Sequence, residues 1–221
     1  MAVLRQYYFR VSALVSAYSL WLVLLLHAVG IVGMLSPWQQ FFRLLTPFNL
    51  IFCGVLLWLN HRDQKVELIR FAAFVFFLGY IVEFVGVHTG VVFGDYTYGA
   101  TLGPRLFGVP VIIGLNWLLI TYSVSVLTDG FKLPVATKVV LGALLAVGID
   151  WLIEPVAMRY DFWSWQKGYV PLRNYIGWFF TSLVMLTSYH ALGVKSENKL
   201  ALPLYLTQLI FFLVLTLSIR F

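Results

Sequence analysis

The sequence predicts an all-α integral membrane protein, a bundle of about seven transmembrane helices that forms one domain over residues 1–221. Hydrophobic residues make up 61% of the chain and charged residues only 11%, whereas soluble domains carry about 25% charged residues. Long apolar stretches follow one another along the whole chain, and no polar linker divides it. The chain is therefore not expected to be a water-soluble globular domain.

Each predicted span is long enough to cross a bilayer. A transmembrane helix needs about 20 mostly apolar residues, because each residue adds about 1.5 Å and the hydrocarbon core is about 30 Å thick. The stretches that meet this requirement lie at about 11–35, 44–60, 67–88, 108–127, 136–154, 174–193 and 199–219. The first is too long for the apolar core of a signal peptide, so we expect an uncleaved span.

The cations indicate an orientation in the membrane. They are scattered singly, so the net charge of +6 does not predict a nucleic-acid-binding surface. The N-terminal side of the predicted bundle carries Arg5, Arg10, Arg62, Lys65, Arg70, Lys132, Lys138, Lys195 and Lys199; the other side carries Arg43, Arg105, Arg159, Lys167, Arg173 and Arg220. Cations accumulate on the cytoplasmic side, so we expect a multi-pass protein of the cell membrane with a cytoplasmic N-terminus.

Two long loops on the other side differ from the rest. Residues 89–107 and 155–173 are rich in aromatic residues, glycine and proline, whereas the cytoplasmic loops are short. Aromatic side chains at a membrane boundary commonly serve as anchors. However, each of these loops follows a span that carries an acidic residue. We therefore expect the two loops to contribute to one site.

Three acidic residues lie within the predicted spans, namely Glu83, Asp150 and Glu154. A charged side chain in the middle of a bilayer is costly, so such residues face the interior of the bundle and mark functional sites. Glu83 lies about 24 Å along its helix and Asp150 about 21 Å along its own, so both are expected at a similar depth. Pro155 predicts that the helix carrying Asp150 ends at Glu154. The alternative to a functional role for Glu154 is a structural ion pair with Arg159 or Arg173.

Small residues flank these acids on the same helix faces. Glu83 shares its face with Gly79, Gly86 and Gly90, and Asp150 shares its face with Gly142 and Ala146. Small residues allow neighbouring helices to approach closely. The pattern therefore predicts that both acids point into helix–helix contacts and not toward lipid.

Several kinds of chemistry find no support in the sequence. The four histidines lie far apart without the spacing of metal ligands, and no phosphate-binding glycine motif occurs. The last span lacks the lysine that a retinal-binding pump requires. No metal, nucleotide or redox cofactor is expected.

What remains is carboxyl chemistry in an aromatic, apolar pocket. Burial disfavours the carboxylate anion, so a carboxyl group there is expected to keep its proton at neutral pH and to serve as a general acid. Tryptophan and tyrosine rings can stabilise a carbocation. This combination suits protonation of an electron-rich alkene in a lipid-soluble substrate.

At these residues the chain resembles the membrane-bound carotenoid biosynthesis proteins, a family that includes carotenoid 1,2-hydratases and the bisanhydrobacterioruberin hydratase of haloarchaea. The resemblance covers about residues 75–180. It rests on Glu83, His88-Thr89-Gly90, Phe93-Gly94-Asp95-Tyr96-Thr97-Tyr98, Leu102-Gly103, Val109-Pro110, Trp117, Asp150-Trp151-Leu152-Ile153-Glu154-Pro155-Val156-Ala157, Trp163-Ser164-Trp165 and the segment Tyr169 to Trp178. Tyr169-Val170-Pro171 departs from the Gly-Ile-Pro that usually precedes the asparagine in the family.

The resemblance implies that water is added across the terminal double bond of an acyclic carotenoid end group, as in lycopene, giving a tertiary alcohol. Glu83, Asp150 and Glu154 are the expected catalytic residues. The expected substrate-binding residues are His88, Asp95, Tyr96, Asn116, Trp163, Trp165, Asn174 and Trp178. Partners would be the polyene, the lipid bilayer and other enzymes of the carotenoid pathway.

Two other functions remain open from the sequence. A proton-initiated carotenoid cyclase would trap the same cation within the substrate, and its product would have unchanged mass. A carotenoid- or lipid-binding membrane protein would hold the pigment without changing it.

Overall fold

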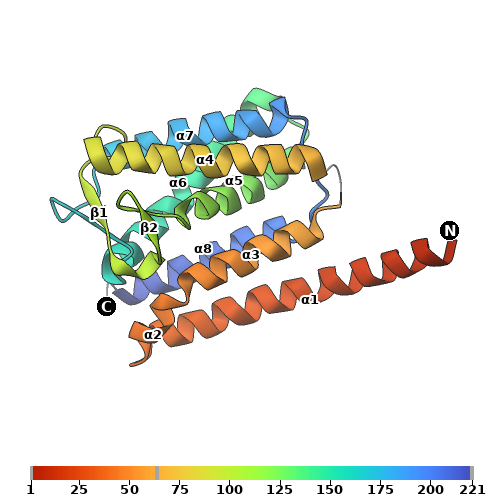
Figure 1. The fold of residues 1–221 in the computed structure, drawn as a ribbon, viewed down its shortest axis with the longest axis horizontal. Coiled ribbons are helices and arrows are strands. Elements are labelled where there is room, and N and C mark those ends of the chain that lie inside the picture. The colour runs from red at the N-terminus through yellow and green to blue at the C-terminus, as the bar shows by residue number, and fades with distance from the viewer. Residues whose placement is uncertain (1, 63–64, 220–221) are drawn as a thin grey trace.

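The computed structural model describes residues 2–62 and 65–219, with side chains described from residue 18 onward. Long helices run alternately up and down a bundle, and the short strands gather at one end (Figure 1). The helices are α1 (Ala2–Met34), α2 (Gln39–Leu44), α3 (Thr46–Asn60), α4 (Lys65–Thr89), α5 (Ile113–Asp129), α6 (Val135–Arg159), α7 (Leu172–Ala191) and α8 (Ala201–Ile219). Each predicted span overlaps one helix, and the mostly helical architecture is confirmed.

The number of membrane-crossing helices stays a prediction. Among the described residues, α4, α6 and α8 are long and apolar enough to cross a membrane. By contrast, α3 has 15 residues and α5 has 17, fewer than the about 20 that a straight crossing needs. Arg5, Arg10 and Arg220, on which part of the predicted orientation rests, lie outside the described side chains.

The helix that carries Asp150 does not end at Glu154, so that prediction is wrong. Helix α6 continues through Pro155 to Arg159. Proline lacks an N–H group but its fixed φ fits a helix, and neighbouring helices in a bundle support such interruptions. Glu154 consequently keeps its place one helical turn beyond Asp150, facing the interior.

Helix α5 begins later than predicted, at Ile113. The residues before it form a small hairpin in which β2 (Arg105–Leu106) pairs with β3 (Val109–Pro110). Gly108 has a φ of 80° at the turn, a conformation that glycine adopts without steric cost. The hairpin occupies residues that hydropathy alone assigns to the span.

The two long aromatic loops, which we expected to contribute to one site, pair with each other through short strands. Strand β1 (Tyr96–Tyr98) lies antiparallel to β4 (Trp163–Trp165), with Tyr96 opposite Trp165 and Tyr98 opposite Trp163. We call this pair of strands the aromatic ribbon. Side chains alternate between the faces of a strand, so the four rings are buried while Thr97 and Ser164 are exposed.

Candidate functional site

The three acids are buried at the end of the bundle that the aromatic ribbon covers. Glu83 is 4% exposed, Glu154 is 1% exposed and Asp150 is fully buried. Among the side chains that the structure describes, no lysine, arginine or histidine forms an ion pair with any of them. The alternative of a structural pair between Glu154 and Arg159 or Arg173 is thus not observed. Neutral donors hold the acids.

Glu83 accepts hydrogen bonds from three aromatic side chains. The Trp117 indole Nε1 donates to Oε1 over 2.9 Å, and the Tyr98 hydroxyl donates to Oε2 over 2.6 Å. The Tyr96 hydroxyl donates to the same Oε2. Burial, and next the nearby Glu83 charge, raise the pKa of both phenols well above the usual range. Both tyrosines therefore remain donors at any physiological pH.

Glycines on α4 make room for these donors. A Cβ atom on Gly79 would lie 2.8 Å from the Trp117 ring, and one on Gly86 would lie 3.0 Å from the Tyr96 hydroxyl oxygen. Real Cβ atoms do not approach other atoms so closely. The predicted small-residue face is therefore the surface on which two of the donors to Glu83 rest.

Glu154 is held by the other strand of the aromatic ribbon. The Trp163 and Trp165 indoles donate to its Oε2 over 3.0 and 2.7 Å. The Asn174 amide nitrogen, from α7, donates to Oε1 over 3.0 Å. Each of its oxygens thus has at least one donor.

Asp150 differs from the two glutamates. The same Asn174 amide nitrogen lies 2.7 Å from its Oδ2, so one asparagine joins Asp150 and Glu154. Its Oδ1 is buried without a hydrogen-bond partner among the described residues. A buried acceptor without a donor is costly, whereas a protonated oxygen needs no donor. Among the described residues, Oδ1 is the one oxygen of the three acids that no donor contacts.

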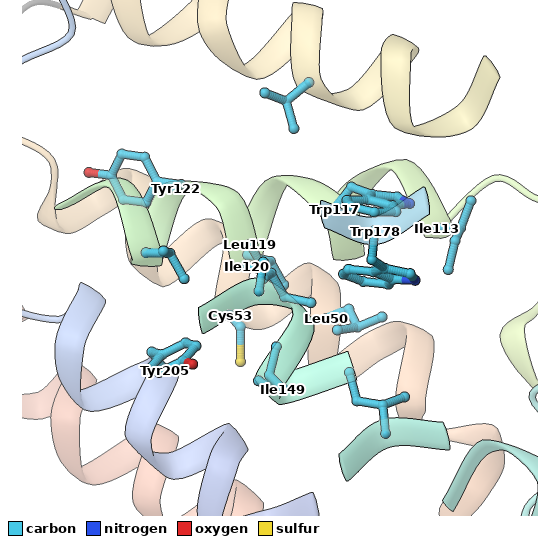
Figure 2. Packing of buried hydrophobic residues seen from close by; sticks show 14 of the residues in the cluster. Leu50, Cys53, Ile113, Trp117, Leu119, Ile120, Tyr122, Ile149, Trp178 and Tyr205 are labelled. Atoms are coloured by element: carbon cyan, nitrogen blue, oxygen red, sulfur yellow. The ribbon is translucent and has the colours of Figure 1, made fainter. Parts of the chain in front are cut away.

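Aromatic rings enclose the acids. Trp178 stacks on Trp117 with ring centroids 3.8 Å apart (Figure 2). The Tyr96 ring lies 5.1 Å from the Trp165 ring, and the Tyr98 ring lies 6.1 Å from the Trp163 ring. The two tyrosine–tryptophan contacts join the two halves of the site, because both tyrosines bind Glu83 whereas Trp163 and Trp165 bind Glu154.

The structure separates three predicted site residues from this cluster. His88 is exposed, and its Nδ1 contacts the Phe84 carbonyl oxygen. Asp95 is exposed beside the ribbon, where its backbone oxygen accepts a hydrogen bond from the Gln166 amide. Asn116 lines a cavity next to the cluster.

Two donors to Glu83, Tyr98 and Trp117, are absent from the predicted site. The signal for Tyr98 lay in the sequence, because it follows Tyr96 by two residues and a strand places both on one face. Trp117 follows Asn116 directly, and hydropathy does not show which of the two faces α4.

Two cavities are each lined by one of the tryptophans that bind Glu154. An apolar cavity of about 410 Å³ is lined by Trp163, Ile153 and Asn116 among others. A polar cavity of about 270 Å³ is lined by Trp165, Asp95, Lys167 and Arg173 among others. The acids themselves line neither, so Trp163 and Trp165 separate Glu154 from the two spaces. No group of three histidine, cysteine or acidic side chains among the described residues is arranged to hold a metal ion.

Comparison with known proteins gives one curated relative. The bisanhydrobacterioruberin hydratase of Haloarcula japonica is 34% identical over 114 residues, which cover 48% of this chain and 39% of that protein. This chain thus spans about two fifths of that relative's length. No solved structure matches the chain. The family model described as carotenoid biosynthesis protein matches residues 43–221, so the chain belongs to the carotenoid biosynthesis protein family.

Proposed function

We propose that this protein is a carotenoid hydratase, which adds water across the terminal double bond of an acyclic end group. The observation that carries the proposal is a buried cluster of carboxyl groups that has no cationic partner among the described side chains and that contacts tryptophans lining an apolar and a polar cavity. Membership of the carotenoid biosynthesis family and the hydratase name of the relative support it.

Asp150 is the proton donor in this mechanism. Its Oδ1 has no hydrogen-bond partner among the described residues, whereas each oxygen of Glu83 and Glu154 accepts at least one. Transfer of the Asp150 proton to the CH carbon of the terminal double bond leaves a tertiary carbocation at the other carbon of that bond, which carries the two methyl groups. The Trp163, Trp165 and Tyr96 rings are placed to stabilise that positive charge.

Water completes the reaction from the polar side. The oxygen lone pair forms the new C–O bond, and the proton that the water loses goes to Glu154, which Asn174 joins to Asp150. Return of that proton to Asp150 restores the enzyme, and the net change is one added water. Because Trp163 lies between the apolar cavity and Glu154, its indole must move aside when the polyene end reaches the acids.

Expression in lycopene-producing cells tests the proposal. We expect pigments that have gained the mass of one or two waters, detected by reversed-phase chromatography with mass analysis. A cyclase would give a new product of unchanged mass, and a binding protein would retain unchanged pigment. Hydrated product from the double variant Glu83→Gln, Asp150→Asn, at the wild-type yield, would refute the assignment of these acids.

A further inference from the structure

The apolar cavity is built largely by helices other than those that carry the acids. Its walls come from α1, α3, α5 and α8, with Ile153 of α6 and Trp163 of the ribbon closing the inner end. Along α1 the lining extends from Leu22 to Met34, a distance of about 18 Å at the rise of an α-helix. The cavity is therefore elongated along the bundle.

One side of the cavity opens between α1 and α3. Leu25 and Val29 of α1 are 58% and 47% exposed, and Phe48 of α3 is 68% exposed, although all three line the cavity. These residues belong to apolar helical stretches, Tyr18–Met34 and Thr46–Asn60. The exposed lining residues of these two helices are all apolar, so the opening suits lipid-soluble molecules.

The cavity is buried beside Ile113 and Trp163, and a buried polar group lines it further back along α8. Ile113 and Trp163 are 3% and 8% exposed. Gln208 of α8 lines the cavity, is 4% exposed, and its Oε1 has no hydrogen-bond partner among the described residues. Trp163 reaches from the inner end to Glu154 through its indole nitrogen. The cavity thus leads from an apolar opening to the neighbours of the acids.

We propose that the acyclic end of a polyene enters this cavity sideways from the bilayer, between α1 and α3, and lies along α1 with its terminus at Trp163. The inference rests on the proposed function for the identity of its occupant. The elongated shape, the apolar opening and the contact with the acid cluster through Trp163 favour an extended hydrocarbon chain. Helix α1 precedes the family match at residues 43–221, so one wall of the site comes from outside the matched part.

Two neighbouring valines on α1 provide a matched test. Val29 lines the cavity, whereas Val32, 70% exposed and one turn further along, does not. Lycopene retained by the purified full-length protein is the readout, together with hydrated product in cells. We expect Val29→Trp to lower retained lycopene about tenfold, which corresponds to 1.4 kcal/mol, whereas Val32→Trp retains the wild-type amount.

A labelling measurement covers the case in which Val29→Trp folds poorly. Val29→Cys and Val32→Cys are treated with an apolar maleimide with and without lycopene, and the native Cys53 is fully buried. Protection of position 29 alone supports the proposal. Equal protection at both positions, or equal retention by both tryptophan variants, overturns it.

The outcomes also separate this inference from the proposed function. Hydration by the wild type with no effect of Val29→Trp would overturn the site and leave the hydratase proposal standing. Retention of unchanged lycopene that Val29→Trp abolishes would support the site and overturn the hydratase proposal.

Discussion

Asp150, Glu83 and Glu154 share one buried cluster but differ in the groups that surround their oxygens. The two glutamates accept hydrogen bonds from indole and phenol groups, whereas Asp150 shares the Asn174 amide and keeps one oxygen without a donor. A carboxylate is satisfied by several donors, while a protonated carboxyl needs fewer. This difference in hydrogen bonding is the basis for the roles we propose, with Asp150 as the acid and Glu154 as the base.

Infrared spectroscopy of the purified protein checks the proton on Asp150. We expect the carbonyl stretch of a protonated carboxylic acid at neutral pH, with a shift in deuterium oxide, and its loss in Asp150→Asn. Asp129→Asn is the control, because Asp129 lies outside the cluster and forms an ion pair with Lys138 over 2.8 Å. Persistence of the band in Asp150→Asn would assign the proton to another group.

Alkaline titration checks the tyrosines that bind Glu83. The pKa of Tyr98 is raised in the folded protein, so its phenol keeps its proton above pH about 10, where an unfolded tyrosine ionises. The stability that this group contributes is complete below that pH and is lost as pH rises through the folded-state pKa. In ultraviolet titration, wild type and Tyr98→Phe should release the same number of phenol protons while folded and differ by one once unfolded. A difference of one in the folded state would contradict the assignment.

Much of the cluster could be predicted from residue types alone. Acidic residues inside apolar spans indicate a functional site, because burying their charge in a bilayer costs free energy. The structure brings Glu83, Asp150 and Glu154 together with Asn174 and the aromatic residues of the ribbon. Trp117 could not be predicted, because an apolar helix does not reveal which of its faces meets α4. His88 and Asp95 are expected in the site only because they belong to the family motif, and both side chains are exposed in the structure.

At the scale of elements, the aromatic ribbon and the glycine face of α4 position the site. The ribbon joins loops about 67 residues apart in sequence, as Thr97 and Ser164 illustrate, and its alternation directs four rings inward. The sequence predicted that these loops belong together but not their strand pairing, because three-residue strands leave too short a periodic pattern. The prediction that α6 ends before Pro155 was wrong, because packing in the bundle supports the helix at this position.

Substitutions of two glycines compare a position in close contact with a neighbouring helix with a position that faces open space. Gly79→Ala would place a methyl group against the Trp117 ring, whereas a Cβ on Gly148 meets nothing within 4 Å. We expect Gly79→Ala to lower the free energy of unfolding by about 1–3 kcal/mol and to reduce hydration. Gly148→Ala should be neutral or slightly stabilising. Denaturant unfolding of the detergent-solubilised protein measures both, and equal effects would contradict the close α4–α5 contact.

At the scale of the whole molecule, the acid cluster lies at one end of an apolar bundle, and the α5–α6 and α7–α8 connections lie at the other (Figure 1). The placement of these connections at opposite ends follows from the order of the helices, which hydropathy predicts well. The side of the membrane that each end faces depends on the distribution of cations.

Accessibility labelling determines that orientation. With a cytoplasmic N-terminus, a cysteine at Lys132, between α5 and α6, should react with an impermeant maleimide only after the cells are opened. A cysteine at Lys167, which lines the polar cavity beside the ribbon, should react in intact cells. The reverse pattern would place the acid cluster toward the cytoplasm and the predicted orientation would be wrong.

Proton donation by Asp150 to a polyene is tested most directly by hydration of lycopene in deuterium oxide. The wild-type protein should give a tertiary alcohol with one deuterium on the carbon next to the one that bears the oxygen. Asp150→Asn should form this product at least about 100-fold more slowly, the usual contribution of a general acid. A product without deuterium on carbon, or an Asp150→Asn variant as fast as the wild type, would contradict acid-initiated hydration by this cluster.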